Sequence, residues 1–272
     1  MKKIILIICA TTLFVACSKS SSDDAPFVPI ATVGNLITRI ETTRNSVARI
    51  ENVTYNGNKI LKVSRADNNK ETRYTYVGNL ISLSENLDNN VLTGSTAYSY
   101  TNDKLTGIIR IEISTSGPTP ITYRNRISFT HNNGTIDFIR FTTNSVNNVE
   151  TQVGNGTYTF LNGNLIKEQY TSSTYNEIIT YTYDSKNNAI RNILGFDKLI
   201  DNEQLSSNNV LTSNQSTNET PIGAASFVTT SNNSYAYVYN VNNYVTSETR
   251  TQTRTNPFSG TNSTVDTTLY FY

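Results

Sequence analysis

Polar and apolar residues alternate along most of the chain, in short stretches that end at turn-forming residues. In residues 74–86, YTYVGNLISLSEN, two tyrosines flank one threonine, so both rings fall on the same face of a β-strand. A Gly-Asn pair and then an aliphatic pair follow, and glycine and asparagine tolerate the positive φ of tight hairpin turns. This stretch therefore predicts a β-hairpin.

The same pattern returns along the chain. Its copies lie at 53–63, 74–83, 98–108, 127–139, 158–168, 181–193 and 237–247, with a half copy at 33–40 and a lone final strand at 267–272. One hairpin is marginal in water, whereas neighbouring hairpins can share an apolar face. We therefore predict an all-β domain, a single extended, twisted antiparallel meander whose sheet is open or curled into a half-barrel. Aliphatic residues three apart, such as Leu105 and Ile108, predict β-bulges.

The pattern lapses between Tyr183 and Tyr239. Residues 192–223 contain one passage of helical character, Phe196 to Leu205, followed by polar, asparagine-rich residues. We expect one short helical or irregular insert there, which caps an open end of the sheet. A functional insertion is the alternative interpretation.

The first residues have the pattern of an export signal. Met1-Lys2-Lys3 leads into an apolar run that is too short to span a bilayer and ends at Ala16. The end of this run together with the next residue, LFVAC at 13–17, is typical of a bacterial lipobox, which predicts a signal peptide at 1–16 and lipidation of Cys17. Residues 17–29 would be a flexible tether and 30–272 the β-repeat domain. An ordinary cleaved signal with an incidental cysteine is the alternative.

The composition argues against several kinds of chemistry. Cys9 would leave with the signal and Cys17 would be acylated, which removes disulfides and thiolate nucleophiles from the folded part. His131 is the single histidine, and 22 basic residues against 21 acidic ones give no cluster for nucleic acid. We therefore expect no enzyme activity, no cofactor, no metal site and no nucleic-acid partner.

The repeat resembles the YD-repeat (Rhs-like) sequences. The best copy, YTYDSKNNAI at 181–190, places Tyr181, Tyr183 and Asp184 as that repeat does. The wider layout resembles small YD-like lipoproteins of Bacteroidetes-type bacteria, through the segment Gly195 to Leu199, Asn208-Asn209 and the closing strand up to Tyr272. The resemblance implies a repeat β-sheet attached to the outer membrane. It implies no toxin role, because about seven copies are too few to enclose a toxin domain.

These features predict a non-catalytic lipoprotein of the cell envelope, anchored in the outer membrane through Cys17. The sheet would be a binding or scaffolding surface for an unknown ligand, with a glycan or an envelope protein as candidate partners. The sequence does not decide which side of the outer membrane the domain faces. It also leaves open whether the tyrosines pack inside the sheet or form an exposed row that binds the ligand. The alternative function is a polysaccharide-acting hydrolase that uses two carboxylates, with the candidates Asp137, Glu168, Asp184 and Asp197.

Overall fold

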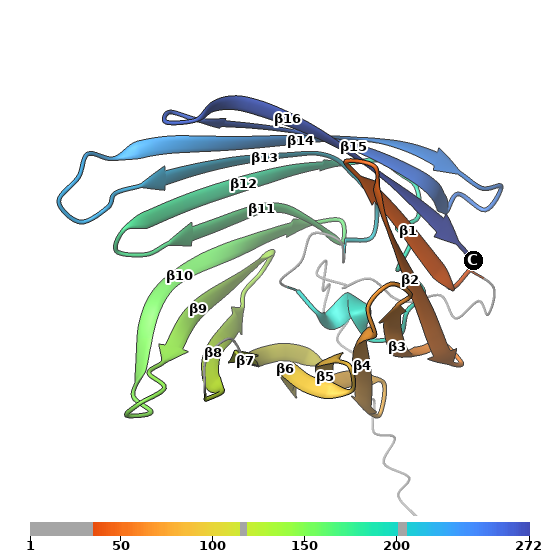
Figure 1. Ribbon diagram of the computed structural model, residues 1–272, viewed down its shortest axis with the longest axis horizontal. Helices are drawn as coiled ribbons and strands as arrows, with labels where there is room; N and C mark the ends of the chain where they lie inside the picture. Colours follow the sequence, from red (N-terminus) through yellow and green to blue (C-terminus); the bar gives the residue numbers. More distant parts are fainter. Residues whose placement is uncertain (1–34, 115–118, 201–205) are drawn as a thin grey trace, which may run out of the picture.

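The protein folds as one closed β-barrel. The computed structural model describes residues 35–114, 119–200 and 206–272, so Cys17 and the proposed signal and tether lie outside the described residues. Each strand pairs antiparallel with its neighbours along the chain, and the first pairs with the last, which closes the ring (Figure 1). The strands are β1 (Arg39–Arg44), β2 (Val47–Asn56), β3 (Lys59–Arg65), β4 (Lys70–Val77), β5 (Leu80–Asp88), β6 (Val91–Thr101), β7 (Lys104–Ser114), β8 (Ile121–His131), β9 (Thr135–Thr143), β10 (Glu150–Leu161), β11 (Asn164–Thr171), β12 (Tyr175–Tyr183), β13 (Val210–Glu219), β14 (Phe227–Tyr239), β15 (Val245–Asn256) and β16 (Gly260–Phe271).

The predicted hairpins and bulges are present. Gly57, Gly78 and Gly163 have positive φ in the turns that follow the aromatic strands. The β6–β7 register shifts by one residue, so that Leu105 faces Tyr100 and Ile108 faces Tyr98 on the same side of the sheet. The extra residue explains how aliphatics three apart both point into the core.

The prediction of an open sheet or half-barrel is wrong. Strand β1, which begins at the end of the half copy, pairs with β16, which contains most of the lone final strand, with Arg39 opposite Phe271 and Arg44 opposite Asp266. Each of them also pairs with its chain neighbour, β1 with β2 and β16 with β15. Pairing them removes both open edges, which would otherwise leave rows of unsatisfied backbone groups.

The predicted insert at 192–223 is also wrong in extent and in structure. Residues 210–219 of that range form β13, and the described remainder contains no α-helix, only one 3₁₀ turn, η1 (Phe196–Lys198). The sequence VLTSNQSTNE has almost no apolar side chains, so its pattern gives no strand signal. It is a strand because β12 and β14 both pair with it. The interruption between strands is residues 184–209.

The inward face of the barrel carries the core. Aromatic and aliphatic side chains cluster in the half of the barrel next to the aromatic hairpin turns, and Phe138 stacks on the fully buried Tyr158 with ring centroids 4.5 Å apart. Since side chains alternate along a strand, the residues between these rings face outward. The tyrosine pairs of the repeat are therefore lining of the barrel, not an outer row.

Candidate functional site

The residues between β12 and β13 that the structure describes, 184–200 and 206–209, lie across the tyrosine-lined end of the barrel and are called the plug below. Figure 1 shows the short turn η1 inside the barrel. The aromatic ring of Phe196, in this turn, packs against Tyr74 of β4. The Leu194 backbone N–H donates to Asn58 O over 2.9 Å, and Tyr76 donates its hydroxyl to Leu194 O over 3.0 Å. The described part of the plug therefore closes this end against several different hairpins.

Asp184 holds the two ends of the plug together. One carboxylate oxygen accepts from the Lys186 and Asn209 backbone N–H groups at 2.9 and 3.0 Å. The other accepts from the Asn209 side-chain amide at 3.0 Å and from the Tyr239 hydroxyl. The aspartate that suggested a YD repeat is thus a structural clamp between the plug and β14.

The opposite end of the barrel is a polar mouth. There many inward positions of the strands carry charged and amide side chains, beside a few aromatic ones such as Tyr123 and Tyr175. Solvent reaches several of them although they point inward, namely Arg49, Lys70, Glu112, Asn125, Arg254 and Asn262. The barrel is therefore a cup, with a packed, plugged floor and a wet mouth, and a barrel of this many strands is wide enough to hold water inside.

Three arginines and one aspartate gather on one wall of the mouth. Asp266 on β16 lies opposite Arg250 on β15 and opposite Arg44 on β1. Arg250 Nε donates to Asp266 Oδ2 over 3.1 Å, and Arg44 Nε lies 3.4 Å from Asp266 Oδ1. Arg254 follows Arg250 two inward positions further toward the rim and is exposed.

Polar atoms beside this group lack partners. Among the described residues, Asn233 Oδ1 and Thr264 Oγ1 are buried without a hydrogen bond, although Gln252 lies between them in the strand register. Buried polar atoms are nearly always satisfied by protein or water. These two therefore mark a place where water or a polar ligand belongs.

Glu248 lies one inward position deeper than Arg250. Burial raises the pKa of the Glu248 carboxyl above its ordinary value, and the negative charge of Asp266 raises it further. The hydrogen bond from the Tyr270 hydroxyl and the positive charge of Arg250 lower the pKa and offset part of this increase. Tyr270 donates to Glu248 Oε2 over 3.0 Å. The cost of ionising this buried group is a property that can be measured.

We expect Glu248→Gln to raise the melting temperature by a few degrees at pH 7 and to leave it unchanged near pH 4. Because the pKa in the folded state is higher than in the unfolded state, the folded protein loses stability as pH rises above about 4.5, the usual glutamate value. Glutamine keeps an oxygen that accepts from Tyr270 and carries no charge. Melting curves of both proteins across this pH range test the expectation; an equal difference at both pH values would contradict it.

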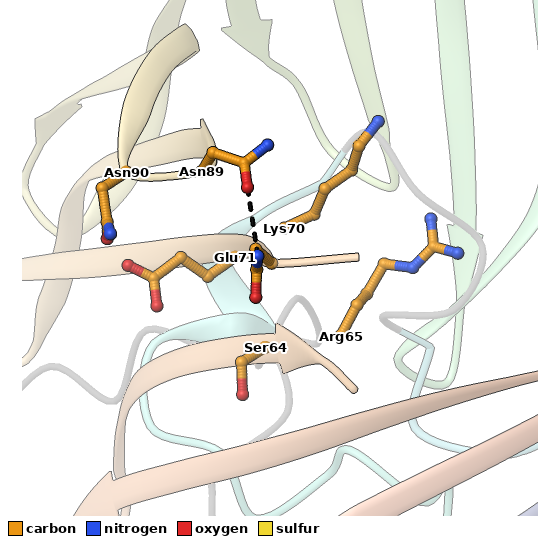
Figure 2. Close-up of a pocket in the computed structure, with 7 residues that line it drawn as sticks. Ser64, Arg65, Lys70, Glu71, Asn89 and Asn90 are labelled. Carbon is orange, nitrogen blue, oxygen red and sulfur yellow. Dashed lines mark hydrogen bonds between the residues drawn. The ribbon is translucent and has the colours of Figure 1, made fainter. Parts of the chain in front are cut away.

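A second polar hollow lies on the rim of the mouth, between the β3–β4 and β5–β6 turns. Its volume is about 340 Å³, and its lining is Ser64, Arg65, Asn69, Lys70, Glu71, Asn89 and Asn90. Asn69 Nδ2 donates to Asn89 Oδ1 over 3.0 Å and ties the two turns together (Figure 2). In Figure 2, Arg65 and Lys70 point to one side of the turn, away from Glu71, Ser64 and Asn90.

The charged side chains of this rim pocket are paired with other groups of the protein. Arg65 is paired with Asp67 at 2.8 Å, Lys70 with Asp88 at 3.3 Å, and Glu71 with Lys62 at 3.3 Å. The aspartates of the two Asp-Asn-Asn turns therefore engage cations of the protein itself. Glu71 also accepts from Arg73 Nε over 2.6 Å, so each charged side chain of the lining already has a partner within the protein.

The carboxylates considered for a hydrolase do not form a pair. Asp137 lies on the outer face of β9 and accepts from Asn132 and Thr157, and Asp197 is in η1 beside Lys198. Glu168 lies in the lumen, 3.5 Å from Arg140, and Asp184 is the clamp of the plug. The two-carboxylate mechanism requires a separation of a few ångströms across a substrate, and these four side chains occupy separate places.

His131, the single histidine, lies at the end of a strand and is not fully exposed. It is the last residue of β8, half-buried, and its Nε2 lies 2.7 Å from Leu105 O. Among the described residues no group of three or more His, Cys, Asp or Glu side chains could hold a metal ion. Within the same ranges no helix is long and apolar enough to cross a membrane.

Solved structures with a similar fold are porin-like proteins. One from Bacteroides vulgatus has a TM-score of 0.54 at 12% identity and covers 88% of this chain and 98% of its own. Another, from Bacteroides uniformis, has a TM-score of 0.51 at 11% identity, with coverages of 86% and 97%. Neither a model of a known protein family nor a curated protein matches the chain.

These comparisons place the chain among closed antiparallel barrels. The inferred resemblance to YD-repeat proteins is therefore wrong, because the repeated hairpins are consecutive strand pairs of one closed barrel. A Tyr-x-Tyr strand followed by a glycine turn describes any hairpin with one aromatic face, so the motif could not distinguish the two architectures.

Proposed function

We propose that this protein is a non-catalytic, lipid-anchored protein of the outer membrane whose barrel stands in water and binds a small ligand in its mouth. The observation that carries the proposal is the combination of a polar outer face with a wet, concave interior. The hydrolase alternative has no support from the positions of its candidate carboxylates.

The outer face is unlike the lipid-facing surface of a membrane barrel. Membrane barrels carry an apolar band about 25 Å tall between aromatic girdles, and an arginine or lysine at its centre costs roughly 2–4 kcal/mol. Here the described tyrosine pairs point inward, and β13–β16 present mainly threonine, serine and asparagine to the outside. Charged side chains also face outward on the other strands, namely Arg39, Glu41, Lys62, Glu71, Arg73, Glu85, Arg124, Arg126, Asp137, Glu150 and Lys167.

A barrel with this surface needs another means of attachment to a membrane. The lipobox ending at Cys17 and the Ser/Asp-rich residues after it supply one. Asn35 O accepts from the Asn192 side chain of the plug, so Asn35, the first residue that the structure describes, lies at the plugged end. A lipid on Cys17 would then hold the floor of the cup toward the membrane, with the mouth facing away.

Replacement of Cys17 by serine should release the protein. We expect Cys17→Ser, expressed in a bacterium that processes lipoproteins, to move essentially all of the protein from the membrane pellet to the soluble fraction. The barrel itself should give the same melting curve as the wild type, because Cys17 lies outside it. Fractionation followed by immunoblotting measures the distribution.

Ser18→Ala is the matched control, since it leaves the acylated thiol in place, and it should remain in the pellet. Retention of Cys17→Ser in the pellet after high-salt and alkaline washes would contradict the proposal, because it would mean that the barrel is itself embedded in lipid.

A further inference from the structure

The arginine group on the mouth wall is set by the strand register. Arg44, Asp266 and Arg250 form one row across β1, β16 and β15, and Arg254 faces Asn262 in a row nearer the rim. Strand β1 ends at Arg44, so the β15–β16 hairpin extends past it. Arg254 therefore projects into the mouth above the other two guanidinium groups.

This group has more positive charge than its carboxylate neutralises. Arg44 and Arg250 share Asp266, which is only 6% exposed, and the three side chains together carry +1. Arg254 has neither a hydrogen bond nor an ion pair within the described part of the chain and adds a second positive charge. Glu248 lies deeper and accepts a hydrogen bond from Tyr270. Even when Glu248 is ionised, the inner wall formed by β1, β15 and β16 keeps a positive surplus at this place.

Four other cations of the lumen are arranged differently. Arg49 pairs with Glu51, Arg65 with Asp67, Lys70 with Asp88 and Arg140 with Glu168. Each of these cations has a carboxylate of its own. Beside these one-to-one pairs, the wall formed by β15, β16 and β1 has more cations than carboxylates.

The polar side chains beside the arginines suit a ligand that is rich in oxygen atoms. Asn262 lies opposite Arg254, and Thr264 and Asn233 carry the buried atoms that lack partners one row deeper. The Thr264 hydroxyl can donate to an anionic oxygen, whereas the unpartnered Asn233 Oδ1 is a carbonyl oxygen that accepts from a hydroxyl of the ligand. Guanidinium groups bind carboxylate, sulfate and phosphate through paired N–H donors, and a concave wall strengthens their field.

We propose that Arg44, Arg250 and Arg254 bind the oxyanion group, a carboxylate, sulfate or phosphate, of a small ligand that enters the mouth of the barrel. Arg254 makes the first contact near the rim. Arg44 and Arg250, fixed by Asp266, bind the anion once it is inside. The proposal rests on the binding role proposed for the mouth, and it does not depend on the lipid anchor.

The test is isothermal titration calorimetry on the purified, folded chain at low ionic strength, with sodium sulfate, potassium phosphate and sodium glucuronate as separate titrants. We expect saturable binding of at least one titrant, weakened when sodium chloride is added. Arg254→Gln should raise the Kd at least fivefold without lowering the melting temperature, because Arg254 is exposed. Arg44→Gln should raise it to a similar extent.

Arg124→Gln is the matched control, an exposed arginine on the outer face of β8, and it should bind as the wild type does. Absence of binding in the wild type, an unchanged Kd in Arg254→Gln, or equal weakening in Arg124→Gln would each overturn the proposal. The titrant that binds most tightly distinguishes a sulfated, phosphorylated or carboxylated ligand. A failure here leaves the fractionation result for Cys17 unaffected, so the two proposals can be rejected separately.

Discussion

Gly156→Ala should destabilise the barrel by about 2–3 kcal/mol, the range in which overpacked core substitutions fall. Gly156 lies on the inward face of β10, opposite Phe138 on β9 and Tyr170 on β11. A methyl group added there would overlap the Gln169 backbone oxygen and the Phe138 ring. The backbone oxygen belongs to a paired strand, and the ring is stacked between Tyr158 and Tyr170, so neither can move aside cheaply.

Urea unfolding of the purified protein measures this loss. Gly107→Ala is the control, because Gly107 is also inside a strand but its added methyl would meet the Ile127 oxygen at 3.7 Å, an ordinary contact distance. We expect the control to stay within about 0.5 kcal/mol of the wild type. Equal effects of the two substitutions would mean that loss of glycine itself, and not the close approach at Gly156, determines the outcome.

Asp184→Ala should cost about 3 kcal/mol and should loosen the plug. The substitution leaves the Lys186 and Asn209 backbone N–H groups and the Tyr239 hydroxyl without their acceptor. Buried donors that lose a charged partner carry the full cost of desolvation. Hydrogen exchange should accelerate at the plug amides of Leu194 and Ser207, which donate to the hairpins at Asn58 and Gly163.

The comparison for this second substitution is Asp137→Ala. Asp137 also accepts two side-chain hydrogen bonds, but it does so on the exposed outer face of β9. We expect less than about 1 kcal/mol of lost stability and no change in exchange at the plug. Unchanged exchange at Leu194 and Ser207 in Asp184→Ala would show that the carboxylate does not clamp the plug.

The sequence predicts the hairpins well because each one is encoded locally. Two rings at alternate positions, a residue that accepts positive φ and an aliphatic after it are enough to predict the strand pair, the turn and even the bulge before Ile108. Closure of the sheet is not encoded in this way. It depends on the pairing of β1 with β16, and no local pattern indicates which edges of a meander will meet.

The candidate site was missed for a similar reason. Arg44, Arg250 and Arg254 stand in threonine-rich strands without a recognisable motif, and only closure of the barrel brings β1 beside β16. The polar half of each strand also looks like an ordinary solvent-facing edge in the sequence. The one indication of these inward arginines in the sequence is the alternation of Arg250, Gln252 and Arg254 with threonines. It places the three polar side chains on one face of β15, the same face of the sheet on which β14 carries Tyr237.

The pairing of the first strand with the last also constrains how the protein folds. The Thr38 N–H bonds the Phe271 oxygen over 2.7 Å, so the barrel cannot close until almost the whole chain is present. Contacts this distant in sequence are slow to form, because the loop between them must be ordered first. Until then both terminal strands offer open edges to other chains. Loss of the last strand should therefore leave an aggregation-prone sheet, not a smaller barrel.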